Sequence, residues 1–319
     1  MINLDLELNG PYYQDYTTPL PPENEDINGY QTFLTLALTK SSIVMVGNCI
    51  HTNSKKALKF VKRRKNTLDR IRNEISLQMI CSHPNILKID DCFPYREYIC
   101  IVSKFSQYGS LHDHITKNYP HGLPESTASI IMNQILEAVS FIHKLNIAHR
   151  DIKPGNFLIF DTNPEHPKVL LNDFGLAKVF NEGETCKEAL GTPILSAPEI
   201  IAKLPYNKSA DSWSLGVTLF FLLNGNFPFP SFELSPKECK LRIVKGQLNY
   251  KLLTEKNISN EAIDLIKKFC HLSPKMRITP SEALLHPWIA SNQKQEDHEF
   301  EYRSVLYESS EEYEFIPGT

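Results

Sequence analysis

The sequence lacks the features that mark membrane-spanning, secreted or zinc-binding proteins. Its longest largely apolar run, Val217 to Leu223, is far too short to span a bilayer. The first residues are acidic and no long apolar stretch follows them, so we expect no secretory signal. The seven cysteines include no C-x-x-C pair, which argues against a disulfide framework and against a zinc site. We therefore expect reduced thiols in a cytoplasmic or nuclear protein that has no membrane partner.

Positive charge is unevenly distributed along the chain. No lysine or arginine precedes Lys40, whereas the stretch from Lys55 to Arg72 is strongly basic, and the formal net charge is −3. A basic run of this length is more often a solvated helix face than a nucleic-acid site. We therefore expect no nucleic-acid partner.

Composition divides the chain into three parts. Residues 1–30 are rich in Pro, Asn, Asp, Glu and Tyr without periodicity, and residues 291–319 are acidic, so we expect a flexible arm and a flexible tail. The 319 residues, of which 41% are hydrophobic, suffice for a large core between them. We expect residues 31–290 to form the folded domain, and the protein to be a monomer.

Two short motifs combine groups with different chemistry. The first is His-Arg-Asp-Ile-Lys-Pro-Gly-Asn at 149–156, and the second is Asp-Phe-Gly at 173–175. Asp151 is a carboxylate that can receive a hydroxyl proton, and Lys153 is a cation on the same side of an extended loop. Asn156 and Asp173 are one neutral and one anionic oxygen ligand, a set that suits Mg²⁺ together with substrate phosphates. A base, a cation and two metal ligands are what phosphoryl transfer needs.

These motifs resemble those of the eukaryotic protein kinases, and Lys153 is typical of the serine/threonine type. The resemblance extends from about Phe33 to Ile289 and includes Ala-Pro-Glu at 197–199, of which Glu199 is implied to pair with Arg277. It implies an α+β, bilobal fold with a small β-rich N-lobe (31–103), a hinge (104–106) and a mainly helical C-lobe (107–290). The alternative is a polar turn between two apolar strands, which does not account for the second motif.

The apolar pattern agrees with this fold. Short apolar runs at 33–38, 43–46, 57–61 and 98–103 predict strands. Apolar spacing at Leu68, Ile71, Ile75 and Met79 predicts a helix over 68–80. Longer helices are predicted over 126–145 and from Asp211 to Leu223, the second with Asp211 able to accept backbone N–H groups at its start. The resemblance implies that Asp211 also ties down the loop at 149–156.

The resemblance implies that the chain transfers the γ-phosphoryl group of ATP to a serine or threonine hydroxyl with Mg²⁺. Asp151 and Lys153 are the implied catalytic residues, with Thr192 bridging them, and Asn156 and Asp173 are the implied Mg²⁺ ligands. Lys59, paired with Glu74, is the implied partner of the α- and β-phosphates. The adenine is implied to lie between Val44, Ala57 and Leu158 and to bond the backbone of Lys104 and Ser106, with the small Ser103 leaving an open pocket behind it.

The largest departure from the family is the nucleotide loop. Its three glycine positions hold Ala37, Thr39 and Ser42. Glycine permits close backbone approach to phosphate, and Cβ atoms restrict it. The hydroxyls of Thr39 and Ser42 could donate replacement hydrogen bonds, and Lys40 could add charge. A second departure is Gln78, where the family places an apolar residue in a stack through both lobes. An unpaired polar group there costs roughly 1–3 kcal/mol, unless Leu77 or Met79 fills the gap instead.

Glu188 occupies the position of the family's phosphorylated threonine, three residues before Gly191. We hypothesise that it pairs with Arg150 and permits activity without loop phosphorylation. The alternative is an ordinary exposed glutamate. Ser110 and Gly155 replace two acids that hold a substrate arginine in basophilic relatives, so the expected partner is a protein substrate without a required upstream arginine.

Two other functions remain open at this stage. A pseudokinase, which binds and signals without transfer, is favoured by the glycine-free loop and Gln78. The intact catalytic and metal-binding residues argue against it. A kinase of small molecules is disfavoured by the full segment from Leu176 to Glu199, which in the family forms a platform for protein substrates.

Overall fold

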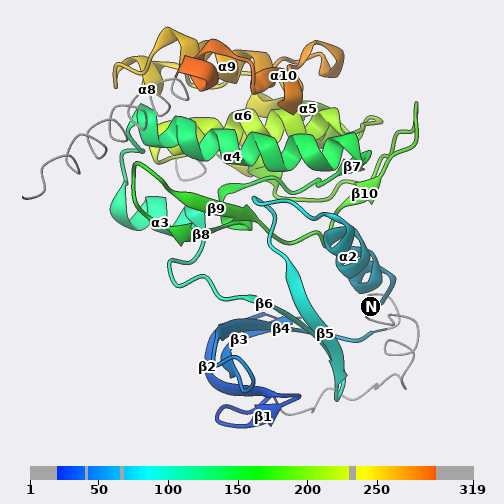
Figure 1. Ribbon diagram of the computed structural model, residues 1–319. Coiled ribbons are helices and arrows are strands. Elements are labelled where there is room, and N and C mark those ends of the chain that lie inside the picture. The colour runs from blue at the N-terminus through cyan, green and yellow to red at the C-terminus, as the bar shows by residue number, and fades with distance from the viewer. Residues whose placement is uncertain (1–19, 40–41, 65–67, 230–234, 292–319) are drawn as a thin grey trace, which may run out of the picture.

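The computed structural model describes residues 20–39, 42–64, 68–229 and 235–291. Within these ranges the chain forms a β-sheet followed by a larger helical region (Figure 1). This is the bilobal architecture expected from the sequence. The expected arm up to residue 19, the tail from residue 292 and Lys40 lie outside the described residues.

The N-terminal lobe is a six-stranded antiparallel sheet in the order β1-β2-β3-β4-β6-β5, with helix α2 (Leu68–Ile80) beside it. The predicted strands at 33–38, 43–46, 57–61 and 98–103 are confirmed and lie within longer elements, and the predicted helix has the observed bounds. The strands are β1 (Asp26–Ile27), β2 (Tyr30–Leu38), β3 (Ser42–Cys49), β4 (Lys55–Lys62), β5 (Ile89–Tyr95) and β6 (Tyr98–Lys104).

Strand alternation divides this sheet into two faces. Ile43, Met45, Leu58 and Phe60 are buried in one apolar cluster on the first face. Cross-strand partners share a face, and Lys59 pairs with both Val44 and Ile101 in the sheet register. Ile101 packs in a second cluster with residues of α2. Lys59 therefore lies on the face that carries α2.

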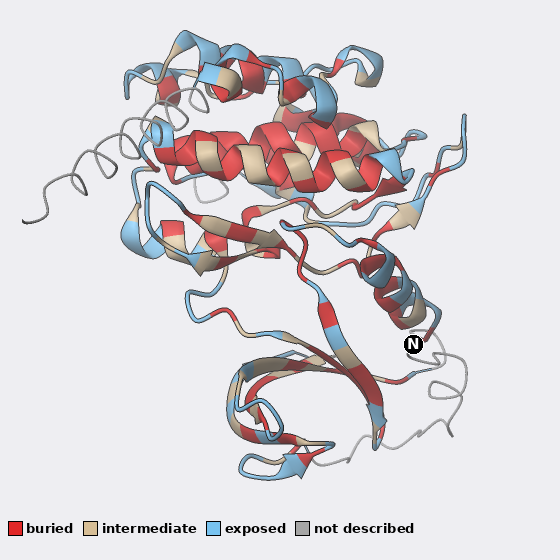
Figure 2. Cartoon of the chain, in the orientation of Figure 1, coloured by how far each residue is buried: buried red, intermediate tan, exposed pale blue. Residues whose placement is uncertain are grey.

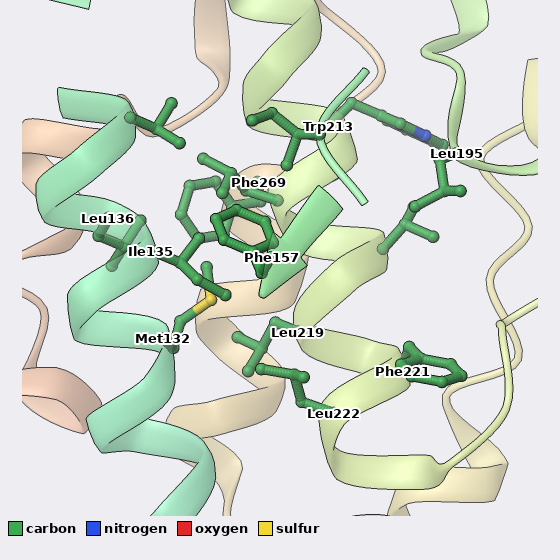
Figure 3. Close-up of a cluster of buried hydrophobic side chains, with 14 of the residues drawn as sticks. Met132, Ile135, Leu136, Phe157, Leu195, Trp213, Leu219, Phe221, Leu222 and Phe269 are labelled. Carbon is green, nitrogen blue, oxygen red and sulfur yellow. The ribbon is translucent and has the colours of Figure 1, made fainter. Parts of the chain in front are cut away.

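The C-terminal region is built around two buried helices, α4 (Glu125–Lys144) and α6 (Ser209–Asn224) (Figure 2). Both were predicted to within two residues of their observed bounds. Helix α6 is apolar on nearly all sides and is accordingly buried on nearly all sides. Gly216 permits its contact with α9 (Asn260–Phe269), because a Cβ there would lie 2.7 Å from Phe269 Cβ. Side chains of α4, α6, α9 and β8 interlock in one cluster (Figure 3).

The remaining elements are short and frame these two helices. They are α3 (Leu111–Asn118), β7 (Ile147–Ala148), η1 (Pro154–Asn156), β8 (Phe157–Asp161), β9 (Lys168–Leu171), β10 (Lys178–Val179), η2 (Pro193–Leu195), α5 (Pro198–Ile201), α7 (Pro236–Val244), α8 (Lys251–Thr254), α9 (Asn260–Phe269), η3 (Pro274–Met276) and α10 (Pro280–Ala283). Among the described residues, no helix combines the length and apolarity needed to cross a bilayer.

A buried ion pair joins α5 to the segment that follows η3. Arg277 Nη1 and Nη2 donate to Glu199 Oε1 and Oε2, each at 2.7 Å, and the two residues are only 5% and 6% exposed. The predicted contact between Glu199 and Arg277 is thus confirmed.

Replacing Arg277 by Met is expected to lower the free energy of unfolding by about 3–5 kcal/mol, because it leaves the Glu199 carboxylate buried without its partner. Chemical denaturation measures the loss. The double change Glu199→Leu with Arg277→Met removes both charges and is the matched control. Equal losses in the single and double variants would show that packing, and not the buried charge, is responsible.

Candidate active site

The loop that follows β7 is fixed by a buried carboxylate. The backbone N–H groups of His149 and Arg150 donate to Asp211 Oδ2 and Oδ1 at 2.8 and 2.9 Å, and His143 Nε2 lies 2.9 Å from Oδ2. Burial opposes ionisation of Asp211, but the bonds from His143 and the loop outweigh it and lower its pKa. The N–H groups that Asp211 accepts belong to the loop, as the resemblance implied. The expectation from helix capping, that Asp211 accepts from its own helix, is not met. Asp211 thus ties the loop to α6.

Asp151 is surrounded by the groups that the sequence predicted. Lys153 Nζ lies 2.6 Å from Asp151 Oδ2, and Thr192 Oγ1 donates to Oδ1 at 3.1 Å. Lys153 Nζ also lies 3.2 Å from Thr192 Oγ1, so the threonine bridges the pair as predicted. Asn156 Nδ2 donates to Asp151 Oδ2 at 3.1 Å and to the Asp151 backbone carbonyl at 2.8 Å. Three side chains from two segments far apart in the sequence therefore meet at one carboxylate.

A second cluster joins the two lobes. Lys59 Nζ on β4 lies 2.6 Å from Glu74 Oε1 on α2 and 3.2 Å from Asp173 Oδ1. Burial alone would lower the pKa of Lys59, but Glu74 and Asp173 outweigh it and the pKa is raised. Burial likewise opposes ionisation of Asp173, yet the charges of Lys59 and His149 lower its pKa. The predicted contact between Lys59 and Glu74 is therefore present.

The two expected metal ligands have oxygens suited to Mg²⁺. Asn156 uses its amide nitrogen on Asp151, and among the described residues no hydrogen bond reaches its amide oxygen. Asp173 is ionised beside Lys59, and its side chain is 43% exposed. The described residues contain no group of three or more His, Cys, Asp or Glu that could hold a metal alone. One carboxylate and one amide fit a metal that phosphates also ligate.

The residues expected around the adenine come from the four strands β3, β4, β6 and β8 and from the hinge. Val44 and Ala57 lie on the same face of the sheet as Lys59. Leu158 lies on β8, where it bridges to Ser110, and Ser103 pairs with Ala57. Ser106 Oγ donates to the carbonyl of Ile159, and Lys104 Nζ lies 5.0 Å from the ring centre of Phe160. The hinge side chains thus bind the C-terminal lobe, which leaves the adenine contacts to the backbone.

The hydroxyls of the glycine-free loop are engaged with each other. Thr39 Oγ1 accepts from the Ser42 backbone N–H at 2.9 Å and lies 3.0 Å from Ser42 Oγ, while the Thr39 backbone N–H donates to the Ser42 carbonyl at 2.8 Å. They close the turn between β2 and β3. We expected these hydroxyls to donate to phosphate in place of the glycine backbone contacts. To do this they must give up their hydrogen bonds with each other. Ala37 lies on β2 opposite Val44.

Gln78 is buried and has a partner. It is 5% exposed, and its Nε2 donates to the Leu87 carbonyl at 2.8 Å. Met79 is exposed and so does not fill the gap, whereas Leu77 is buried in the same apolar cluster as Phe174. Because the amide is hydrogen-bonded, the cost expected for an unpaired polar group does not arise.

Glu188 reaches the arginine of the catalytic loop. Arg150 Nη1 donates to Glu188 Oε2 at 2.6 Å and lies 3.4 Å from the Tyr206 hydroxyl, which donates to the Glu188 carbonyl at 2.8 Å. Arg150 lowers the pKa of Glu188 through this bond. The predicted contact is therefore present, although the Glu188 side chain is itself 57% exposed, as the alternative of an exposed loop glutamate expected.

Several contacts at the site were not predicted from the sequence. Tyr206 is a single tyrosine in an irregular segment, and its role at Glu188 follows only from the fold. On α2, Arg70 Nε donates to the Gly175 carbonyl at 2.7 Å and Asn73 Nδ2 to the Ala177 carbonyl at 2.8 Å. The contacts of Arg70 and Asn73 could have been inferred from spacing. Residues three or four apart on a helix lie on the same side of it, and Asn73 adjoins Glu74. They attach α2 to the segment after Asp173.

One contact qualifies the expectation about substrate arginine. Ser110 occupies an acid position of basophilic relatives, but its Oγ donates to the carboxylate of Asp113 at 2.7 Å. The Asp113 carboxylate is also hydrogen-bonded to His112, so both of its oxygens already have a partner within the protein. Gly155 adds no side chain. Negative charge near Ser110 is thus lower than two acids would provide, but it is not absent.

Comparisons with known proteins agree with this geometry. The model of the protein kinase domain matches residues 40–289. A probable myosin light chain kinase of Dictyostelium discoideum is 36% identical over 271 residues, which is 83% of this chain and 53% of the relative. Calcium-dependent protein kinase 3 of Plasmodium yoelii yoelii is 37% identical over 235 residues, covering 73% and 43% of the two chains. Calcium/calmodulin-dependent protein kinase type 1 of Caenorhabditis briggsae is 32% identical over 290 residues, covering 88% and 77%.

The fold and these matches define a protein kinase. The chain belongs to the protein kinase family, and within it to the serine/threonine kinases. The matched segment spans about half the length of the first two relatives, 53% and 43%.

Proposed function

We propose that this chain transfers the γ-phosphoryl group of ATP to serine or threonine hydroxyls of a protein substrate. The observation that carries the proposal is the convergence of Lys153, Thr192 and Asn156 on the Asp151 carboxylate, together with the triad of Lys59, Glu74 and Asp173. Such a set is what transfer requires, because its catalysis consists mostly of positioning and charge neutralisation.

Each residue has a role that follows from its contacts. Asp151 orients the attacking hydroxyl and accepts its proton. Lys153, 2.6 Å from that carboxylate, neutralises charge on the transferring oxygens. Lys59, oriented by Glu74, binds the α- and β-phosphates. Asn156 and Asp173 would hold Mg²⁺, which when bound neutralises phosphate charge.

The proposed substrate is a protein segment that needs no upstream arginine. Gly155 offers no charge, and the Asp113 carboxylate beside Ser110 is already bonded to Ser110 and His112. The segment from Leu176 to Glu199 supports a protein rather than a small molecule as acceptor. A peptide array in which upstream arginine dominated the accepted sequences would contradict this part of the proposal.

A binding module without phosphotransfer is the competing function. It is favoured by the mutual hydrogen bonds of Thr39 and Ser42, which occupy the hydroxyls expected to approach phosphate. Both functions are tested by Mg·ATP-dependent phosphate incorporation into a generic serine/threonine substrate. Incorporation above the level of an Asp151→Asn variant supports the kinase, and its absence supports the binding module.

Activity without loop phosphorylation rests on Glu188. The Arg150 side chain is 8% exposed and needs an anionic partner, so Glu188→Ala is expected to lower kcat of the unphosphorylated protein by about three- to ten-fold. Because the pKa of Glu188 is lowered in the folded protein, the ion pair persists at neutral pH and is lost only as the pH falls through that lowered value. Kinetics of protein whose unphosphorylated state is verified by mass spectrometry measure the change.

Glu184→Ala is the matched control, because Glu184 pairs with Lys178 in the same segment but does not contact Arg150. Unchanged turnover in Glu188→Ala, or an equal loss in both variants, would remove Glu188 from the mechanism.

A further inference from the structure

Helix α7 (Pro236–Val244) has an exposed side that is both basic and apolar. Residues three, four or seven apart lie on the same side of a helix, which places Lys237, Lys240, Leu241 and Val244 together. Both lysines are exposed, and Leu241 and Val244 are 52% and 40% exposed. We call these four residues the α7 face. Two cations beside two apolar side chains suit an acidic segment that carries an apolar residue.

The positive charge of the α7 face is not neutralised by acidic side chains of the described residues. In the part of the chain that the structure describes, neither Lys237 nor Lys240 forms an ion pair, and Lys245 follows at the end of the helix. The one acid on α7 is Glu238, whose Oε2 accepts from the backbone N–H and hydroxyl of Ser235 at 2.8 and 2.6 Å. Glu238 is thereby held at the helix start as part of a capping box. An anionic partner would have to come from another molecule or from outside the described residues.

The position of α7 connects this face to the reaction centre. Helix α7 packs against η2 and α5. Segment η2 (Pro193–Leu195) begins directly after Thr192, which donates to Asp151 at 3.1 Å. A polypeptide whose hydroxyl lies at Asp151 and which continues along η2 therefore reaches α7 within a few residues. The α7 face is thus the exposed side of a helix that adjoins the segment leading to Asp151.

We propose that the α7 face binds an acidic segment of the protein substrate, close in sequence to the phosphorylated residue. This inference rests on the proposed kinase function and narrows its substrate class. The substrate's Glu or Asp side chains pair with Lys237 and Lys240, and an apolar side chain packs against Leu241 and Val244. The charge of the face favours this occupant over a basic segment.

The test compares three peptides: a neutral serine peptide and two extended versions that carry Glu-Glu-Leu-Glu before or after the serine. We expect one extended peptide to be phosphorylated with kcat/KM about five-fold above the neutral peptide, through a lower KM. The double variant Lys237→Glu with Lys240→Glu loses this preference and keeps its activity on the neutral peptide. The preference of the unaltered protein also falls as salt is raised, because exposed ion pairs are screened.

The control variant carries Lys55→Glu and Lys144→Glu, which make the same change of charge at exposed lysines on β4 and α4. It is expected to keep the preference. The proposal is overturned if neither acidic peptide is preferred, or if the α7 variant keeps the preference. It is also overturned if the α7 variant accelerates reaction with the neutral peptide, which would show that the acidic tail of this chain occupies the face. Failure to phosphorylate any peptide would instead overturn the proposed function itself.

Discussion

Asp151→Asn is expected to lower kcat by about 10²–10⁴-fold while leaving ATP binding nearly unchanged. The asparagine keeps the shape of the side chain and can still accept from Thr192, but it cannot accept the proton of the attacking hydroxyl. Lys153, which lies 2.6 Å from Asp151 in the unaltered protein, also loses its anionic partner. Steady-state kinetics measure the loss of turnover, and nucleotide titration measures binding.

The control for this variant is Asp161→Asn, which makes the same chemical change at an exposed position on β8. It is expected to retain full activity. A decrease in ATP affinity that accounts for the whole loss in Asp151→Asn would place Asp151 in nucleotide binding and remove it as the proton acceptor.

Asp173→Asn is expected to lower phosphate transfer by roughly 10³-fold, because a resident metal contributes several kcal/mol of charge stabilisation to such reactions. The substitution removes the anionic one of the two proposed Mg²⁺ ligands. It also leaves Lys59 with Glu74 as its remaining carboxylate partner. The variant therefore removes a proposed metal ligand, while the Lys59–Glu74 ion pair can remain in place without any change in the backbone.

Thermal unfolding provides a readout that does not depend on turnover. A ligand that binds only the folded state raises the melting temperature, and the rise is larger when the ligand binds more tightly. Mg·ATP is expected to stabilise the unaltered protein more than ATP with a chelator does, and this difference is expected to vanish in Asp173→Asn. If the variant kept the full difference, Asp173 would not be a metal ligand.

The sequence was most informative where the resemblance to the protein kinases fixes which positions meet. That resemblance implied the pair of Lys59 with Glu74 and placed Glu188 at Arg150. Spacing alone predicted one contact, because the short loop at 149–156 puts Lys153 on the same side as Asp151.

The sequence was less informative where the partner is a backbone group or a distant loop. Gln78 was expected to weaken the apolar stack, but it donates to the carbonyl of Leu87, which no residue type reveals. The Thr39 and Ser42 hydroxyls were expected to face phosphate, yet in this structure they bond each other. Tyr206 reaches Glu188 only because the chain folds back on itself, so local patterns could not place it. The contact of Asp113 with Ser110 is local, three residues apart at the start of α3, and was missed.

Transfer of the γ-phosphoryl group itself tests the central claim most directly. The measurement is incorporation of label from γ-labelled ATP into a serine/threonine protein substrate, with Mg²⁺ or with a chelator, followed by analysis of the modified residue. We expect Mg²⁺-dependent phosphoserine or phosphothreonine with the unaltered protein, and a signal at least about 10²-fold lower with Asp151→Asn. Protein that binds Mg·ATP but incorporates no more label than Asp151→Asn would contradict the account and identify a binding module with a kinase fold.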